Sequence, residues 1–140
     1  MADPGRRFQE FIEFLTAFVC ELNALAEDGA AVVVEGKRDK EALTELGYSG
    51  PVFTKAMLHS ERWASGLGRV KLAIILTDLD EEGRRLAARY TEFFALRGVK
   101  TSLTQRRRLL KASHGTFLHV ENLGRFAPTV PEIIALTTKI

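Results

Sequence analysis

The chain has 140 residues, of which 20 are lysine or arginine and 18 are aspartate or glutamate, so its net charge is +2. Because 46% of the residues are hydrophobic and 27% are charged, the composition excludes a mainly disordered chain and predicts one packed domain. The single cysteine excludes an internal disulfide and a cysteine-rich zinc site, which favours a cytoplasmic location. Its apolar stretches are much shorter than the ~20 residues of a membrane span, so no association with a membrane is expected.

Residues 7–28 form the first predicted element, an amphipathic N-terminal helix. Its apolar side chains recur at spacings of three and four residues, and Asp28 and Gly29 end it. One interpretation is a helix that covers the core of the domain. The alternative is a homodimer contact, because the phenylalanine-rich face is wide for one small sheet to cover.

Strands and helices alternate in the next part of the chain. The run at 30–34 is apolar without polar alternation, which is typical of a parallel strand covered on both faces. Further strands are predicted at 51–55, 70–77 and 99–104, with helices at 37–46 and 81–96 and a weaker helix or loop at 59–67. This order predicts an α/β fold with an open, mainly parallel four-stranded sheet flanked by helices.

Residues 105–140 are predicted to be a short basic extension of the same domain. No acidic residue occurs from position 93 to position 120, whereas six basic residues do, and the remainder carries 14 basic and 18 acidic residues. We expect a basic helix at 105–112, a short strand at 117–120 and a final helix at 132–136. Arg106, Arg107 and Arg108 would bind phosphate or nucleic acid, or would simply face solvent.

Acidic residues follow two of the predicted strands, at the edge where open parallel sheets bind ligands. Glu35 closes the first strand, and Asp78 and Asp80 close the third. Since neighbouring strands lie about 4.8 Å apart, the three carboxylates are expected to meet and to hold Mg²⁺, or else Mn²⁺. Asp80 can instead cap the next helix and Asp78 can be a turn residue, whereas Glu35 is harder to explain in this way. His114 and His119 lack the usual spacing of metal ligands, so no metal role is expected for them.

Basic residues and a helix start lie beside these acids. Gly36 would let the backbone turn tightly into a helix whose first N–H groups attract phosphate. Lys37, Arg38 and Arg84 lie within one or two helical turns of the acids, where they would bind a phosphodiester, or else are solvated helix residues. Asp39 is expected to interact with the helix dipole or to orient Lys37 rather than to bind metal.

Two motifs of the chain together resemble the Toprim (topoisomerase–primase) domain. They read Val-Val-Val-Glu35-Gly36-Lys-Arg-Asp39 and, about forty residues later, Ile-Ile-Leu-Thr-Asp78-Leu-Asp80-Glu-Glu-Gly83-Arg84. The resemblance covers residues 30–104, and in length the chain is similar to the small stand-alone Toprim proteins of archaea and some bacteria. It implies a four-stranded parallel sheet with Mg²⁺ at its carboxyl edge. It also implies that Glu35 is the acid/base residue and first metal ligand, with Asp78 and Asp80 as the other ligands.

The chemistry that this resemblance implies is the making or breaking of nucleic-acid phosphodiesters. No separate domain supplies a nucleophilic tyrosine, which excludes a complete type II-like topoisomerase, and the acids that Toprim primases carry after the fourth strand are missing. The prediction is a single domain, residues 1–140, that acts on RNA or DNA with Mg²⁺, most simply by hydrolysis. The alternative is a non-catalytic nucleic-acid-binding or assembly module that requires a partner subunit.

Overall fold

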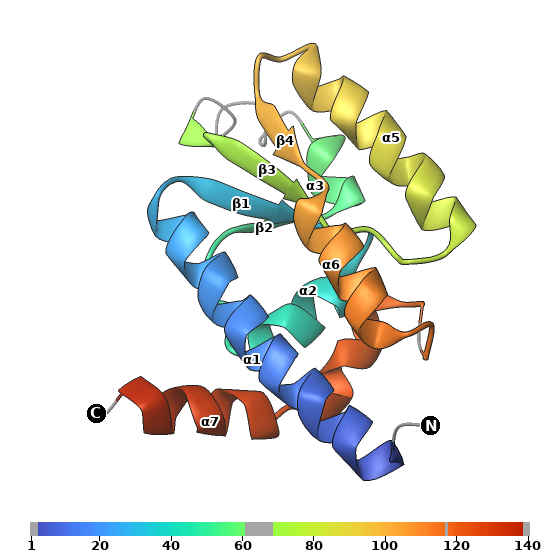
Figure 1. The fold of residues 1–140 in the computed structure, drawn as a ribbon. Helices are drawn as coiled ribbons and strands as arrows, with labels where there is room; N and C mark the ends of the chain where they lie inside the picture. Colours follow the sequence, from blue (N-terminus) through green and yellow to red (C-terminus); the bar gives the residue numbers. More distant parts are fainter. Residues whose placement is uncertain (1–2, 61–68, 117, 139–140) are drawn as a thin grey trace.

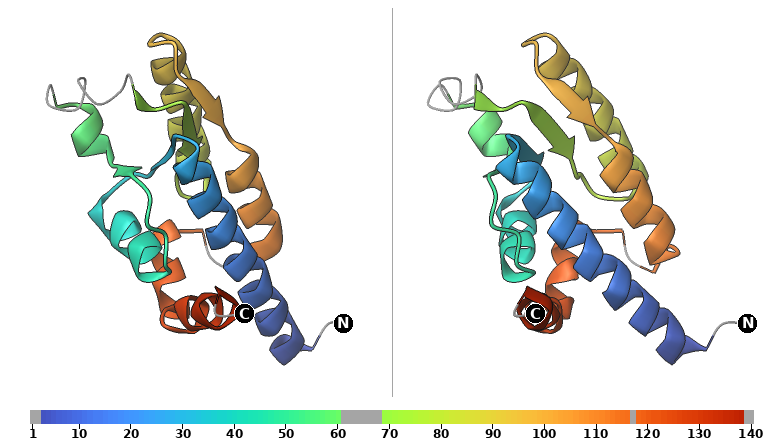
Figure 2. Two further views of the ribbon diagram at one scale, coloured as in Figure 1. Left: turned by 90° about the vertical axis from the view of Figure 1, so that its left-hand side faces the viewer. Right: turned by 60° about the vertical axis from the view of Figure 1, so that its left-hand side comes forward.

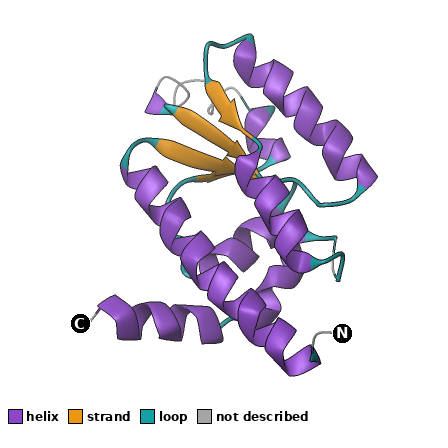
Figure 3. Cartoon of the chain, in the orientation of Figure 1, coloured by secondary structure: helices purple, strands orange, loops and turns teal. Residues whose placement is uncertain are grey.

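The structure is a computed structural model that describes residues 3–60, 69–116 and 118–138 of the chain. Helices lie on both faces of a central sheet, and further helices continue beyond one end of the sheet (Figure 1). Figure 3 shows the same arrangement by type of element, with the strands gathered in one half of the molecule. The α/β fold class predicted from the sequence is confirmed.

The sheet is open and all its strands are parallel, in the order β2-β1-β3-β4. The strands are β1 (Ala30–Val33), β2 (Val52–Phe53), β3 (Leu72–Ile75) and β4 (Lys100–Ser102). The central pair is in register from one end to the other, and Val33 of β1 lies opposite Ile75 of β3. The residues that follow these two strands therefore leave the sheet side by side at its carboxyl edge.

The larger apolar core lies on the face of the sheet that α1 (Pro4–Glu27) covers. Leu15, Phe18 and Leu22 of α1 have no exposed surface, which confirms that this helix covers the core. The homodimer contact through the same helix stays a prediction. Figure 2 shows α6 (Thr104–Ser113) running beside α1 on this side of the molecule.

The smaller core lies on the opposite face, under α5 (Glu81–Ala95) and α3 (Lys55–Leu58). Successive strand residues point to opposite faces, so Val32 enters the larger core and Val33 the smaller one. Both faces of the central strands are thus buried, which explains why their sequences are apolar without alternation.

The C-terminal part of the chain differs from its prediction. The short strand expected at 117–120 is wrong for the described residues, because Val120–Phe126 forms a 3₁₀ segment, η2. The buried residues of η2 are apolar and recur every three positions, at Val120, Leu123 and Phe126. They pack one side of η2 against α2 (Lys37–Glu45). The final helix, α7 (Thr129–Thr138), begins earlier than expected and packs on α1.

Two further findings concern the other expected elements. Most of the weaker helix or loop expected at 59–67 lies outside the described residues. Among the helices of the described ranges, none has the length and apolar character needed to cross a membrane.

Candidate metal centre

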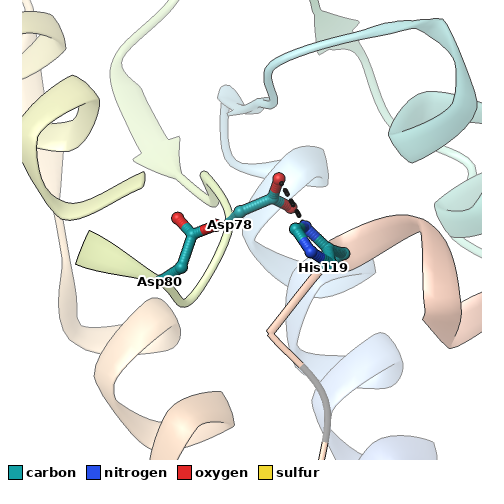
Figure 4. A group of neighbouring side chains, drawn as sticks. All are labelled: Asp78, Asp80 and His119. Atoms are coloured by element: carbon teal, nitrogen blue, oxygen red, sulfur yellow. Dashed lines mark hydrogen bonds and ion pairs between the residues drawn. The ribbon is translucent and has the colours of Figure 1, made fainter. Parts of the chain in front are cut away.

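The loop that follows β3 carries the centre of the site. The carboxylate of Asp78 accepts a hydrogen bond from the backbone N–H of Val120 at Oδ1 (2.8 Å), and its Oδ2 lies 3.2 Å from Nδ1 of His119 (Figure 4). Asp80 caps α5, since its Oδ1 accepts a hydrogen bond of 2.7 Å from the N–H of Gly83. The helix-cap interpretation of Asp80 is therefore confirmed. In each aspartate, one carboxylate oxygen is fixed by a backbone donor.

Asp78, Asp80 and His119 form a cluster that is able to hold a metal ion. Each residue offers one ligand atom, and the three atoms lie within 4.8 Å of one another. Sequence spacing missed His119, because its contact with Asp78 joins residues 41 positions apart. That contact raises the pKa of His119, through the hydrogen bond and the charge of Asp78.

Glu35 approaches the same loop from the end of β1. Its Oε1 accepts a hydrogen bond of 3.3 Å from the backbone N–H of Asp78, while its carboxylate stays outside the cluster of three ligand atoms. Burial, and after it the charge of Asp78, raises the pKa of Glu35 to about 7. Tyr90 of α5 is also near, and its buried hydroxyl has no hydrogen-bond partner among the described residues. The structure thus brings Glu35 against Asp78, and it groups Asp78 with Asp80 and His119.

The turn after Glu35 leads into α2, whose start is supported by the side chain of Asp39. Asp39 accepts a hydrogen bond from the N–H of Gly36 at 3.0 Å, as expected of a residue that supports the helix start. The chain bends into α2 at residues 35 and 36, as expected, and Gly36 has the extended backbone typical of an N-cap residue, with φ −144° and ψ 179°. Lys37 points to Glu41 at 3.9 Å rather than to Asp39.

Arg106 is placed differently from the other predicted cations. It was expected to present its charge on an exposed helix face, but the side chain is buried, with 7% of the residue exposed. One guanidinium nitrogen donates to the backbone carbonyl of Asp78 at 2.6 Å and to that of Asp80 at 3.4 Å. Its Nε is buried without a hydrogen-bond partner in the described part of the chain. Burial lowers the pKa of Arg106. Arg106 therefore supports the loop that carries Asp78 and Asp80 from inside the protein.

The other predicted cations are exposed on three helices. Arg84 pairs with Glu81 of its own helix, and Arg108 pairs with Glu21 of α1 at 2.7 Å. Arg38 and Arg107 are exposed and have no ion-pair partner among the residues that the structure describes. These two side chains are the least engaged of the predicted phosphate-binding residues.

The fold and the site together define a class of protein: an all-parallel α/β protein whose acidic residues gather at the carboxyl edge of the sheet. The UPF0292 protein MJ1624 of Methanocaldococcus jannaschii is 35% identical to the chain over 119 residues, which cover 84% of this chain and 92% of that protein. A UPF0292 protein of Methanosarcina acetivorans is 35% identical over 121 residues, covering 83% of this chain and 81% of the relative. The chain belongs to the UPF0292 family.

A solved structure supports the same fold. A protein from Aquifex aeolicus matches with a TM-score of 0.61 and 26% sequence identity, over 76% of this chain and 94% of that one. No family model matches the chain.

Proposed function

We propose that the chain is a Toprim-type protein that binds a divalent cation such as Mg²⁺ and hydrolyses phosphodiesters of RNA or DNA. One observation carries the proposal: acids from two strand ends meet. Glu35, after β1, accepts a hydrogen bond from the backbone of Asp78, after β3, and Asp78 lies in one cluster with Asp80. The same three residues carry the sequence resemblance to Toprim domains.

The donor atoms at this edge fit a divalent cation. Asp78 and Asp80 supply carboxylate oxygens, which hard cations prefer. Each of them has one oxygen held by a backbone N–H, and this bond orients the other oxygen. The pKa of Glu35 is raised to about 7, first by burial and then by the charge of Asp78, and a bound cation would offset this charge repulsion.

Under this proposal each acid has its own task. Asp78 and Asp80 hold the cation, which when bound polarises a phosphate oxygen and makes water a better nucleophile. Glu35, with a pKa of about 7, takes a proton from the attacking water and returns one to the leaving oxygen. Arg106 keeps the loop of Asp78 and Asp80 in place through its bonds to their carbonyl groups.

The substrate class follows from the exposed cations at the same edge. α2 begins directly after Glu35 and α6 begins after β4, so both helices start at the carboxyl edge of the sheet. Lys37, Arg38 and Arg107 are exposed on these helices. Exposed cations in such positions bind a phosphate backbone without reading its sequence.

The test is cleavage by the purified protein of a structured RNA and of a duplex DNA, with Mg²⁺, with Mn²⁺ or with a chelator. Glu35→Gln removes the proton acceptor and is expected to slow cleavage at least ~100-fold. Glu92→Gln makes the same change at an exposed position of α5 and is expected to cleave at the wild-type rate. Cleavage that persists in the chelator, or in Glu35→Gln, contradicts the proposal.

The second candidate is a non-catalytic module that binds nucleic acid and acts with a partner. The exposed side chains of Arg38 and Arg107, for which the described ranges hold no ion-pair partner, favour it, because they suit binding and are given no part in the chemistry. It predicts salt-sensitive binding without cleavage, measured by fluorescence anisotropy between about 50 and about 200 mM salt. Arg107→Gln should weaken binding and lower the slope of log affinity against log salt by about one.

A further inference from the structure

We propose that His119 is a ligand of the cation, which makes the site a mixed nitrogen–oxygen centre that favours Mn²⁺ or Co²⁺ over Mg²⁺. The inference rests on the proposed function in one respect only, that a divalent cation binds at Asp78 and Asp80. It adds a residue from the C-terminal segment, which lies outside the part of the chain that resembles Toprim domains.

The backbone on both sides of His119 is fastened to the loop that carries the two aspartates. The N–H of Leu79 donates to the carbonyl oxygen of Leu118 at 2.6 Å. On the other side of the histidine, the N–H of Val120 donates to Oδ1 of Asp78 at 2.8 Å. These two bonds hold the segment in place without the imidazole. The imidazole makes a contact of its own, with Oδ2 of Asp78, and a bound cation would take the place of that contact.

The imidazole lies where a ligand is required. Its Nδ1 is 3.2 Å from Oδ2 of Asp78, and adjacent ligand atoms on an octahedral ion with bonds of about 2.1 Å are about 3 Å apart. Asp80 completes a set of three ligand atoms within 4.8 Å of one another (Figure 4). The three side chains are therefore close enough to one another to be candidates for binding one ion.

Exposure of the two contacting side chains differs in a way that suits metal entry. The Asp78 side chain is 15% exposed, whereas the His119 side chain is 54% exposed. The histidine therefore stands on the solvent side of the site, with the carboxylate behind it. The imidazole is therefore accessible to an ion that arrives from solvent.

The chemistry of the ligand set gives the ion preference. Mg²⁺ strongly prefers oxygen ligands and keeps much of its water, so an imidazole adds little to its binding. First-row transition ions bind imidazole nitrogen well, and their affinity for such sites rises from Mn²⁺ to Co²⁺. Loss of His119 should therefore reduce the affinity for Co²⁺ much more than the affinity for Mg²⁺.

The experiment measures Co²⁺ and Mg²⁺ binding by titration calorimetry for the wild-type chain, His119→Asn and His114→Asn. Asparagine keeps an amide N–H close to the position of Nδ1, so a hydrogen bond to Asp78 can persist without the imidazole ligand. His114 is an exposed histidine with φ 51°, a conformation that asparagine tolerates, which makes it the matched control. Thermal melts without metal establish that each variant is folded, and His119→Gln replaces His119→Asn if the latter melts early.

We expect His119→Asn to bind Co²⁺ ~10- to 100-fold more weakly than wild type, with less than a ~3-fold change for Mg²⁺. The visible absorption bands of bound Co²⁺ should shift in this variant and stay unchanged in His114→Asn. An unchanged Co²⁺ affinity and spectrum, or equal losses for both ions, overturns the role of His119 and leaves the proposed function standing. If the wild-type chain binds neither ion, the cation site of the proposed function fails and the inference fails with it.

Discussion

The two acidic strand ends of this sheet are held with different rigidity. After β3, the hydroxyl of Thr77 donates to the carbonyl oxygen of Gly83 at 2.7 Å, and Arg106 donates to the carbonyls of Asp78 and Asp80. The turn is thus held by a side chain that follows β3, Thr77, and by one from a separate helix, Arg106. Such a turn keeps two carboxylates in fixed positions, as a metal site requires.

After β1, the turn has fewer supports. The capping bond from the N–H of Gly36 to Asp39 closes it, and Glu35 reaches across to the N–H of Asp78 through a single hydrogen bond of 3.3 Å. Glu35 is also the acid whose pKa is raised to about 7. Under the proposed function, the strand end after β3 would hold the cation, and the one after β1 would place the acid whose pKa is raised to about 7.

The largest expected effect on the free energy of unfolding comes from replacing a glycine by alanine, and it should differ between the two strand ends. A Cβ built on Gly83 would lie 1.9 Å from the carbonyl oxygen of Asp78, whereas one on Gly36 would meet nothing closer than Asp39 at 3.9 Å. Gly83→Ala should therefore lower the free energy of unfolding by at least about 2 kcal/mol and weaken cation binding. Gly36→Ala should cost less than about 1 kcal/mol. Urea denaturation measures both, and similar losses in the two variants would contradict the difference in rigidity.

The next effect concerns Arg106, which supports the tighter strand end. Arg106→Gln removes the guanidinium that bonds to the carbonyls of Asp78 and Asp80 in a buried position. We expect a loss of about 1–3 kcal/mol in the free energy of unfolding, together with weaker cation binding. Arg107→Gln is the control, because this neighbour is exposed and should change stability by less than about 0.5 kcal/mol. A loss for Arg106→Gln no larger than that for Arg107→Gln would show that Arg106 does not support the loop.

Much of this site was accessible from the sequence, because both strand ends follow long apolar runs. Strands buried on both faces leave a recognisable pattern, and acids placed directly after two such strands must share one sheet edge. Glu35, Asp78 and Asp80 were found in this way.

The remaining parts of the site depend on contacts that no local pattern records. His119 reaches Asp78 across 41 positions, and Arg106 reaches the same residue across 28. A triple of arginines looks the same in sequence whether its members face solvent or the interior, and only the packing of α6 decides that Arg106 is buried. The segment η2 has only seven residues, too few for its spacing of three to stand out from a short strand.

The contribution to stability of Glu35, which follows β1, is expected to depend on pH. The folded pKa of Glu35, about 7, lies above its ordinary value of 4.5, so the folded state binds this proton more tightly than the unfolded chain. The contribution of Glu35 to stability is therefore present below about pH 4.5 and is lost as the pH rises through about 7. When a chelator is present, the free energy of unfolding of Glu35→Gln should depend less on pH than that of the wild-type chain.

Urea denaturation at about pH 5 and about pH 8 measures the effect, with Glu92→Gln as a control that keeps the wild-type slope. A bound divalent cation should reduce the loss of stability that the wild-type protein shows as the pH rises, since the cation offsets the charge of the ionised Glu35. The same pH dependence in Glu35→Gln as in wild type would assign the effect to another group.

The smallest expected effect lies on α6, two positions from Arg106. Arg108 pairs with Glu21 of α1 at 2.7 Å, with side chains that are 48% and 35% exposed. Because exposed ion pairs are screened and cost side-chain entropy, a double-mutant cycle with Arg108→Gln and Glu21→Gln should give a coupling below about 1 kcal/mol, and this coupling should vanish near 1 M salt. A salt-resistant coupling above about 2 kcal/mol would mean that the exposed face of α6 fastens it to α1. In that case Arg108 would be unavailable to a phosphate backbone.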